Sequence, residues 1–389
     1  MDQQTVFKRM TQSIDTETLG ERLRIARSQA NLTQEASASA LGVSRTTLIA
    51  IESGQRRARN DELLVLANLY ATTVGHLVSV DSIHVDLAAK FRRIENRARS
   101  SGSGEAIALL NALVSGAVEL ERALGAELKY DYPPPVRVSS SNYAAQAEDS
   151  AISFRYRFGF GPGRIDDLYS ALELDVGIRV FSRDLKDSEI SGLYAFDSDI
   201  GACILVNSKH HWRRRMQTLA HEAGHFVSDR SDASITEEDT SQLPVGEKFA
   251  RRFGAALLMP APTVRSRFDH LTFERGGIDV QGLILLAHYF GVASEAMCRR
   301  LEELDLLADG TWQSMRDRGF SSNHEKEVLG DAPSYAAAPL ISPRLGYLAA
   351  RALRQELLSE GQLCEMLLVD RVYLRHTMRA FQVEMAPKL

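Results

Sequence analysis

The residues best suited to chemistry lie at positions 218–226, which read Thr-Leu-Ala-His-Glu-Ala-Gly-His-Phe. On a helix, His221 and His225 stand one turn apart on the same face, a separation that suits two ligands of a tetrahedral zinc ion. Glu222 lies beside the first ligand, where it can take a proton from activated water and pass it to a leaving amine. The other residues are largely apolar and predict a buried helix, in which such polar groups need partners. The pattern therefore favours a zinc-peptidase site over an exposed helix with two surface histidines.

A catalytic zinc ion normally takes three protein ligands, so we expect a third one downstream. Glu247 begins a helix whose apolar residues follow at helical spacing, which would point its carboxylate into the domain. The alternatives are Asp232, Glu237, Glu238 and Asp239, which lie in a polar segment typical of a solvated loop. We favour Glu247.

Two histidines precede the motif and are candidates for polarising a scissile carbonyl. His210 and His211 stand just before the run Arg213-Arg-Arg215. Either imidazole could stabilise a developing negative charge. A solvated basic loop explains the same residues, so the sequence assigns no residue to this task.

Beyond the ligand spacing, these motifs resemble the IrrE/ImmA metallopeptidases. The likeness runs over about residues 145–308 and rests on His221-Glu-Ala-Gly-His225, Glu247-Lys-Phe-Ala250, Phe253 and Leu257-Leu-Met-Pro260. It implies that Glu247 is the third ligand of Zn²⁺, with another divalent ion such as Mn²⁺ as an alternative. It also implies cleavage of a protein such as a repressor or an antitoxin-like regulator. The chain departs from the family at Arg251 and Gly254, where asparagine and alanine are usual.

A second set of motifs occupies residues 16–79, where short helical patterns are separated by glycines. Thr33 and Ser44 are predicted N-caps of the second and third helices, and Ser53-Gly54 ends the third. Leu32-Thr-Gln34, Leu41-Gly-Val-Ser44 and Ile51-Glu-Ser-Gly54 resemble the helix-turn-helix of the XRE family, the Cro and phage-repressor type.

That resemblance implies that the third helix enters the major groove of an operator by its N-terminal end. The residues that it places at double-stranded DNA are Gln34, Ser44, Arg45, Thr46, Thr47, Ala50, Arg56 and Arg57. Arginine side chains there can read guanine or bind phosphates, and hydroxyl groups can bind phosphates. Arg27 and Glu52 are expected to form an internal ion pair. Residues 16–62 hold seven arginines against six acidic residues, so a role in protein contact alone is the alternative.

The whole chain is predicted to be mainly helical with a small β-sheet, an α+β fold. We expect a five-helix helix-turn-helix domain at 16–79, connecting helices at 80–129, a proline-rich linker at 130–143, a zincin-like peptidase domain at 144–309 and a helical C-terminal region at 310–389. The connecting helices suit either a hairpin or a dimerisation element. Short strands are expected at 177–181, 191–196 and 201–207, a helix at 164–174 and irregular structure at 310–340.

Composition excludes several classes of protein. The 389 residues are 44% hydrophobic and 25% charged, as in an ordinary globular chain, and the net charge of −5 leaves DNA binding to a local surface. The three cysteines, Cys203, Cys298 and Cys364, are far apart, which excludes a disulfide framework and a zinc ribbon. Without an apolar signal core or a run of about 18 apolar residues, we expect no membrane span and a cytoplasmic protein.

Together these features predict a DNA-binding regulator that cuts a specific regulatory protein, and a homodimer is one candidate assembly. One rival is a regulator whose peptidase fold only senses a signal or binds a partner. Another is an interaction protein that binds no DNA. Self-cleavage near residues 130–142 is a further hypothesis.

Overall fold

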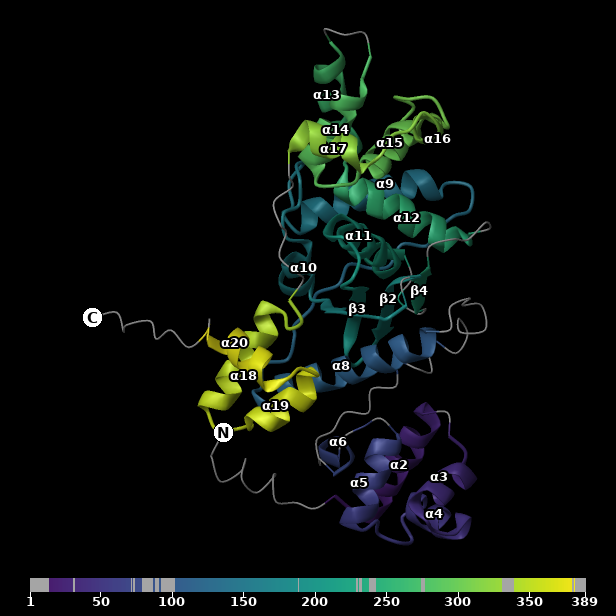
Figure 1. Ribbon diagram of the computed structural model, residues 1–389, viewed down its shortest axis with the longest axis vertical. Coiled ribbons are helices and arrows are strands. Elements are labelled where there is room, and N and C mark those ends of the chain that lie inside the picture. The colour runs from purple at the N-terminus through teal and green to yellow at the C-terminus, as the bar shows by residue number, and fades with distance from the viewer. Residues whose placement is uncertain are drawn as a thin grey trace, which may run out of the picture. The chain divides into compact units, whose positions relative to one another are not determined.

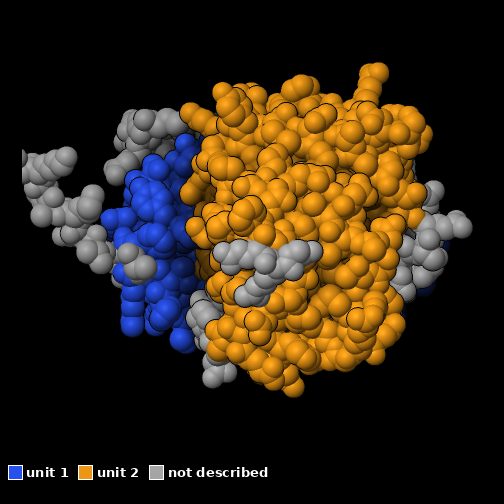
Figure 2. Space-filling view, turned by 90° about the horizontal axis from the view of Figure 1, so that it is seen from above, with its two compact units in different colours: residues 1–89, 108–128, 343–389 blue, residues 90–107, 129–342 orange. Residues whose placement is uncertain are grey.

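The computed structural model of the chain describes residues 14–30, 32–70, 72, 74–78, 87, 91, 102–187, 189–228, 230, 233–237, 243–273, 277–330, 339–379 and 381 (Figure 1). Helices dominate the described residues and one small sheet accompanies them, so the α+β fold class predicted from the sequence is confirmed. The chain divides into two compact units, coloured separately in Figure 2. One unit comprises residues 1–89, 108–128 and 343–389, and the other comprises residues 90–107 and 129–342. The finer domain boundaries given above stay predictions.

Among the described residues, the N-terminal part of the first unit contains five helices, as the sequence predicts. They are α2 (Thr16–Gln29), α3 (Gln34–Leu41), α4 (Arg45–Glu52), α5 (Asn60–Leu69) and α6 (Val74–Val78). The predicted caps are confirmed, because the side chain of Thr33 accepts from Ala36 N and that of Ser44 accepts from Thr47 N. Each cap satisfies an amide that the first turn of the helix leaves unpaired.

A shared apolar core and one buried ion pair hold these helices together. The core is formed by residues such as Leu23, Leu48 and Leu66, each 0% exposed. The predicted pair of Arg27 and Glu52 is also confirmed, with Arg27 Nε 2.6 Å from Glu52 Oε1. This pair joins α2 to the end of α4 and therefore fixes the helix that carries the expected DNA contacts.

The remainder of the first unit is built from α8 (Ser103–Ala123), whose first residues belong to the second unit, and from three C-terminal helices. These are α18 (Pro343–Arg354), α19 (Glu360–Leu367) and α20 (Arg371–Arg379). Glu121 of α8, which is fully buried, pairs with Arg344 of α18 at 2.6 Å. Ser359 caps α19, its side chain accepting from Gln362 N.

Helix α8 is long and apolar enough to cross a membrane by length and composition, with a mean hydropathy of 1.2 over its best window. However, 56% of that window is buried inside the protein, as in a core helix of a water-soluble chain. This single helix is weak support for a membrane span.

The second unit contains the sheet, whose strand order is β1-β3-β2-β4. Its strands are β1 (Arg179–Arg183), β2 (Ile190–Asp197), β3 (Gly201–Asn207) and β4 (Ser234–Glu237). β1 runs parallel to β3, whereas β2 is antiparallel to both β3 and β4. β3 is buried along its whole length, which explains why its β-branched run was recognisable from the sequence.

Helices cover this sheet and supply most of the core of the second unit (Figure 1). In chain order they are α9 (Tyr143–Arg157), α10 (Leu168–Ser170), the π-helix η1 (Ala171–Val176), α11 (Trp212–Ser228), α12 (Val245–Leu258), α13 (Ala261–Thr272), α14 (Val280–Phe290), α15 (Ser294–Glu303), α16 (Thr311–Asp317) and α17 (Ser322–Leu329). Helix α11 contains the motif at 218–226, and α12 carries Glu247 in its first turn, as the sequence predicts.

Four local expectations were wrong. The polar segment expected as a loop contains β4, because antiparallel pairing with β2 satisfies its backbone without an apolar pattern. The stretch 310–340 contains α16 and α17, which are held by Trp312 in the core and by the ion pair of Glu325 with Arg213. The helix expected at 164–174 begins only at Leu168, after Asp167 caps it. The first strand lies two residues later than expected, at Arg179–Arg183.

Much of the segment expected as a linker, residues 130–143, is packed within the second unit. Tyr132 Oη donates to Gly177 O at 2.6 Å and accepts from Ala202 N at 3.1 Å. Further along, Val136 N donates to Val227 O at the end of α11. Helix α8 already ends at Ala123, before the prolines at 133–135, and these prolines lie in an extended, docked segment. Self-cleavage there would first require these contacts to break.

Candidate metal centre

Helix α11 brings the two histidines of the motif together at its buried face. Leu219, Ala220, Ala223 and Phe226 are all 0% exposed and fix this helix against the sheet and α12. The Nε2 atoms of the two histidines lie 3.1 Å apart. The helical spacing predicted from the sequence is therefore present as a pair of converging imidazoles.

Glu247, at the start of α12, completes the group. Its Oε1 lies 3.2 Å from His221 Nε2, and its Oε2 lies 3.1 Å from His225 Nε2. Two ligands of a tetrahedral zinc ion, at bond lengths of about 2.0–2.1 Å, stand about 3.3 Å apart. The three donor atoms thus fit a zinc ion after shifts of only a few tenths of an ångström. Among the residues that the structure describes, His221, His225 and Glu247 form the group of histidine and carboxylate side chains that could hold a metal ion.

The other candidates for the third ligand do not join this group. Glu237 lies at the end of β4, opposite Ile190. Asp232, Glu238 and Asp239 fall outside the described residues.

The charges in the group favour an ionised Glu247. Burial alone would raise the pKa of its carboxyl, but the contacts with His221 and His225 outweigh burial and hold the pKa well below its usual range. An anionic carboxylate between two imidazoles is the form that binds a cation. The side chains of His225 and Glu247 are 15% and 21% exposed, so the group is open to solvent on their side.

Glu222 follows His221 directly on α11 and is 0% exposed. Thr236 Oγ1 donates to its Oε1 at 2.7 Å, and Ser234 Oγ donates to its Oε2 at 3.0 Å. Burial raises the pKa of Glu222 to about 7, although His225 and the two hydroxyl groups act to lower it. A carboxyl group with such a pKa suits proton transfer near neutral pH.

Close helix packing sets the distance between the two sides of the metal group. A Cβ on Gly224 of α11 would lie 2.6 Å from Ala250 Cα, and one on Gly254 of α12 would lie 2.9 Å from His221 N. The two helices can approach this closely because each presents a glycine to the backbone of the other. Gly254, one of the departures from the family pattern, is therefore required by the crossing as it stands.

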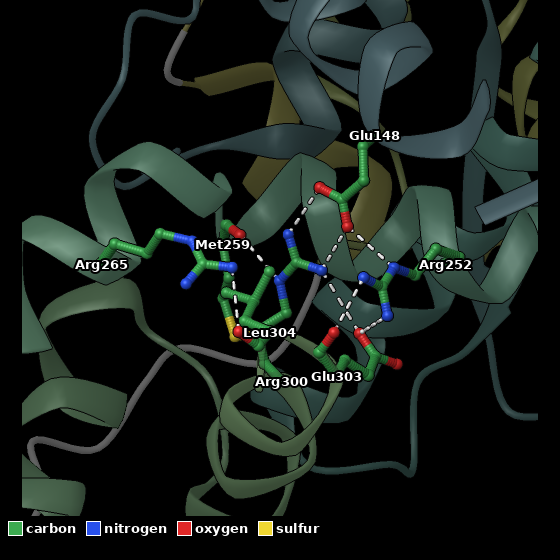
Figure 3. Close-up of polar contacts among 7 residues, drawn as sticks. All are labelled: Glu148, Arg252, Met259, Arg265, Arg300, Glu303 and Leu304. Atoms are coloured by element: carbon green, nitrogen blue, oxygen red, sulfur yellow. Dashed lines mark hydrogen bonds and ion pairs between the residues drawn. The ribbon is translucent and has the colours of Figure 1, made fainter. Parts of the chain in front are cut away.

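A buried ion network holds the far end of α12 (Figure 3). Arg300 of α15, whose side chain is 0% exposed, donates from Nε to Met259 O and from Nη1 and Nη2 to the two oxygens of Glu148 on α9. Arg252 of α12 shares the same carboxylate at 2.8 Å. These bonds tie α12 to α9 and α15, and thereby fix the helix that carries Glu247.

Sequence reasoning missed Ser234, Thr236 and Gly192 because their roles depend on strand pairing. The only signal was a pair of hydroxyl residues two positions apart, which would share a face if the segment were a strand. Tyr194 was missed for the same reason, and its ring stacks 6.4 Å from that of His225.

The two histidines considered for polarising a carbonyl are remote from the group. His211 stands just before α11 begins, ten residues ahead of His221. At the rise of an α-helix this is about 15 Å along the axis. Neither His211 nor its neighbour His210 can therefore polarise a scissile carbonyl held at the three ligands.

At the N-terminal domain, the expected DNA contacts fall into two groups. Ser44, Arg45, Thr46 and Arg57 are exposed, and no ion pair or hydrogen bond of the guanidinium of Arg45 or Arg57 is found among the described residues. The others, Gln34, Thr47, Ala50 and Arg56, are partly buried.

Two of these partly buried side chains are engaged within the domain. Gln34 Nε2 donates to Glu52 Oε2 at 2.9 Å, and Arg56 pairs with Glu62 at 2.8 Å. Arg45 and Arg57 are therefore the cations most available to a nucleic acid.

Comparison with known proteins agrees with both parts of the chain. Residues 18–79 match the family model described as a helix-turn-helix domain, and residues 174–302 match the peptidase model described as an IrrE N-terminal-like domain. The comparison with curated proteins gives no match. Among solved structures, that of ComR from Streptococcus suis matches with 10% identity over 96% of this chain and 97% of that one. Its TM-score is 0.17, which is too low to show that the two folds are alike. The chain thus carries an XRE-like helix-turn-helix DNA-binding domain fused to an IrrE/ImmA-like metallopeptidase domain.

Proposed function

We propose that this protein is a DNA-binding regulator whose IrrE-like domain is a zinc-dependent endopeptidase. It cuts one or a few regulatory proteins, such as a repressor or an antitoxin-like partner, in the cytoplasm. The observation that carries this proposal is the convergence of His221, His225 and Glu247 at 3.1–3.2 Å, with the buried carboxylate of Glu222 beside them.

In this mechanism the three ligands hold the ion and Glu222 moves the proton. A bound Zn²⁺, or Mn²⁺ as the alternative, supplies Lewis acidity that polarises a carbonyl and acidifies water. Glu222 accepts a proton from the attacking water and later donates it to the amine that leaves when the peptide C–N bond breaks. Its exclusion from solvent, and the pKa of about 7 that follows, suit both halves of this task.

The DNA-binding half rests on the helix-turn-helix match and on the exposed N-terminal end of α4. We expect Arg45, which is exposed there, to read a base edge and the exposed Arg57 to bind phosphate. Gln34 must exchange its bond with Glu52 before it can contact DNA. Domains of this type commonly bind as dimers, which makes a homodimer on a two-fold operator the natural arrangement.

The test compares cleaved proteins in cells that express the wild-type chain or the Glu222→Gln variant. We expect the variant to keep its zinc and to lose cleavage of a small set of targets. Zinc analysis of the purified proteins is the control, because a variant that lost the ion would fail for another reason. Equal cleavage by both chains would sink the mechanism. Full zinc content with no target cut by the wild type would favour a sensor or partner-binding domain instead.

A further inference from the structure

Both carboxylate oxygens of Glu222 accept a hydrogen bond from the same short strand. The donors are the hydroxyl groups of Ser234 and Thr236, at 3.0 and 2.7 Å. A carboxylate bound at a single oxygen can still pivot about its side chain, whereas one bound at both oxygens has a defined plane. The strand therefore determines how the carboxylate of Glu222 is oriented beside the histidines.

Strand geometry explains why these two residues act together. Side chains two positions apart on a strand lie on the same face, so Ser234 and Thr236 both point from β4 toward α11. Pairing with β2 sets their position along the helix, with Ser234 opposite Tyr194 and Thr236 opposite Gly192. A slip by one residue would turn both hydroxyl groups away from Glu222.

Gly192 of β2 leaves the space that the carboxylate fills. A Cβ at this position would lie 3.0 Å from Glu222 Oε1 and 2.6 Å from the Thr218 methyl group. Any larger residue would therefore push the carboxylate or the helix away. The carboxylate of Glu222 thus packs against Gly192 of β2 and accepts hydrogen bonds from two hydroxyl groups of β4.

We propose that Ser234 and Thr236 are positioning residues that orient Glu222 for proton transfer, and that Gly192 keeps room for it. This inference rests on the proposed function, since it assigns the two hydroxyl groups to the same peptidase reaction. Among the residues that the structure describes, no hydrogen bond or ion pair joins Ser234 or Thr236 to the three metal-binding side chains, so their loss should alter the reaction step and leave metal binding intact.

The first test needs no substrate. The infrared carboxylate band of Glu222 is isolated as the difference between the full-length wild-type chain and Glu222→Gln. We expect this band to shift in the Ser234→Ala/Thr236→Val double variant and to stay in place in Thr236→Ser, which keeps a hydroxyl group. A band that does not move in the double variant overturns the inference, whatever the protein cleaves.

The second test measures cleavage by the zinc-loaded full chain. Its substrate is a target identified by comparing the proteins cleaved by the wild type and by Glu222→Gln. We expect the double variant to lower kcat about 10- to 100-fold, as expected for a misplaced catalytic group. KM and zinc affinity should stay within about twofold, and Thr236→Ser should recover most of the rate. Thr263→Val is the matched control, because Thr263 lies on another helix, α13, and its hydroxyl group donates to Pro162 O rather than to Glu222.

The outcomes separate the two proposals. If Glu222→Gln cleaves like the wild type, the proposed function fails. The infrared result still shows whether Ser234 and Thr236 orient the carboxylate of Glu222. If Glu222→Gln is inactive but the double variant keeps or exceeds the wild-type kcat, the positioning role is wrong. A parallel loss of zinc affinity and kcat would also overturn it, since the hydroxyl groups would then support the metal site as a whole.

Discussion

Substituting Gly254 by alanine should weaken metal binding without touching a ligand. The added Cβ would lie 2.9 Å from His221 N, 3.0 Å from Ala220 C and 3.1 Å from His221 Cα. All three neighbours are backbone atoms of α11, so no side chain can turn away to make room. Relief requires the two helices to separate.

The size of that separation follows from ordinary contact distances. Ordinary van der Waals contact of a Cβ begins at 3.4 Å, so reaching it lengthens the closest approach, now 2.9 Å, by about 0.5 Å. Glu247 lies on α12, while both histidines lie on α11, so the shift enlarges the gap between the two parts of the metal group. Metal sites tolerate errors of about 0.2 Å in ligand distance, and support defects of this kind cost about 10- to 100-fold in affinity. We expect a loss of zinc affinity in that range.

The assay is a competitive zinc titration against a chromogenic chelator, with circular dichroism to follow folding. Overpacking should cost about 1–3 kcal/mol, partly offset by about 1 kcal/mol from the better helix propensity of alanine. Gly246→Ala is the matched control on the same helix, because its Cβ would meet nothing within 4 Å. If Gly254→Ala binds zinc as tightly as Gly246→Ala, the helix crossing does not set the metal geometry.

Three further outcomes test other parts of the structure. Although burial opposes it, hydrogen bonds and ion pairs with two arginines lower the pKa of Glu62 from 4.5 to about 2, which corresponds to about 3 kcal/mol, reduced by solvent screening at the exposed arginines to about 2 kcal/mol. This contribution should be complete above pH 4.5 and be lost as the pH falls toward 2, so the stability difference between the wild type and Glu62→Gln in acid unfolding should close over that range, and a difference that stays constant contradicts the prediction. In operator-binding titrations, Arg57→Ala should lower the salt slope by about 1, whereas Arg45→Ala should relax base preference at one position; unchanged slopes and preferences would remove both from the interface. Replacing the buried Arg300 by methionine leaves its carboxylate partner short of donors and should destabilise the peptidase domain by about 3 kcal/mol in denaturant unfolding, and a loss below 1 kcal/mol would show the network to be dispensable.

The features predictable from the sequence are those encoded within one or two helical turns. The pair His221 and His225 and the caps Thr33 and Ser44 each depend on residues at most four positions away. Glu247 was reached through the apolar face of its own helix and through family resemblance. In all these cases local spacing determines which side of a helix a residue occupies.

The features that escaped prediction depend on partners distant in the chain. β4 has an unremarkable polar sequence, and only its pairing with β2, some forty residues earlier, makes it a strand. Helix α17 likewise owes its place to Glu325, which binds Arg213 and Ser294. Such contacts leave no period in the sequence, so a polar stretch that becomes a strand or a docked helix cannot be told from a loop.

Three independent contacts converge on α11 and give the candidate centre its shape. The glycine crossing with α12 sets the distance from His221 and His225 to Glu247, while the hydroxyl groups of β4 set the orientation of Glu222. The docked segment reaches the end of the same helix through Val136. Because α11 carries both the ligands and the base, any displacement at one of these contacts changes the relation between metal binding and proton transfer. Ligand spacing alone therefore describes this centre incompletely, and variants at Gly254 and Thr236 should separate the two properties, since the first moves Glu247 and the second moves only Glu222.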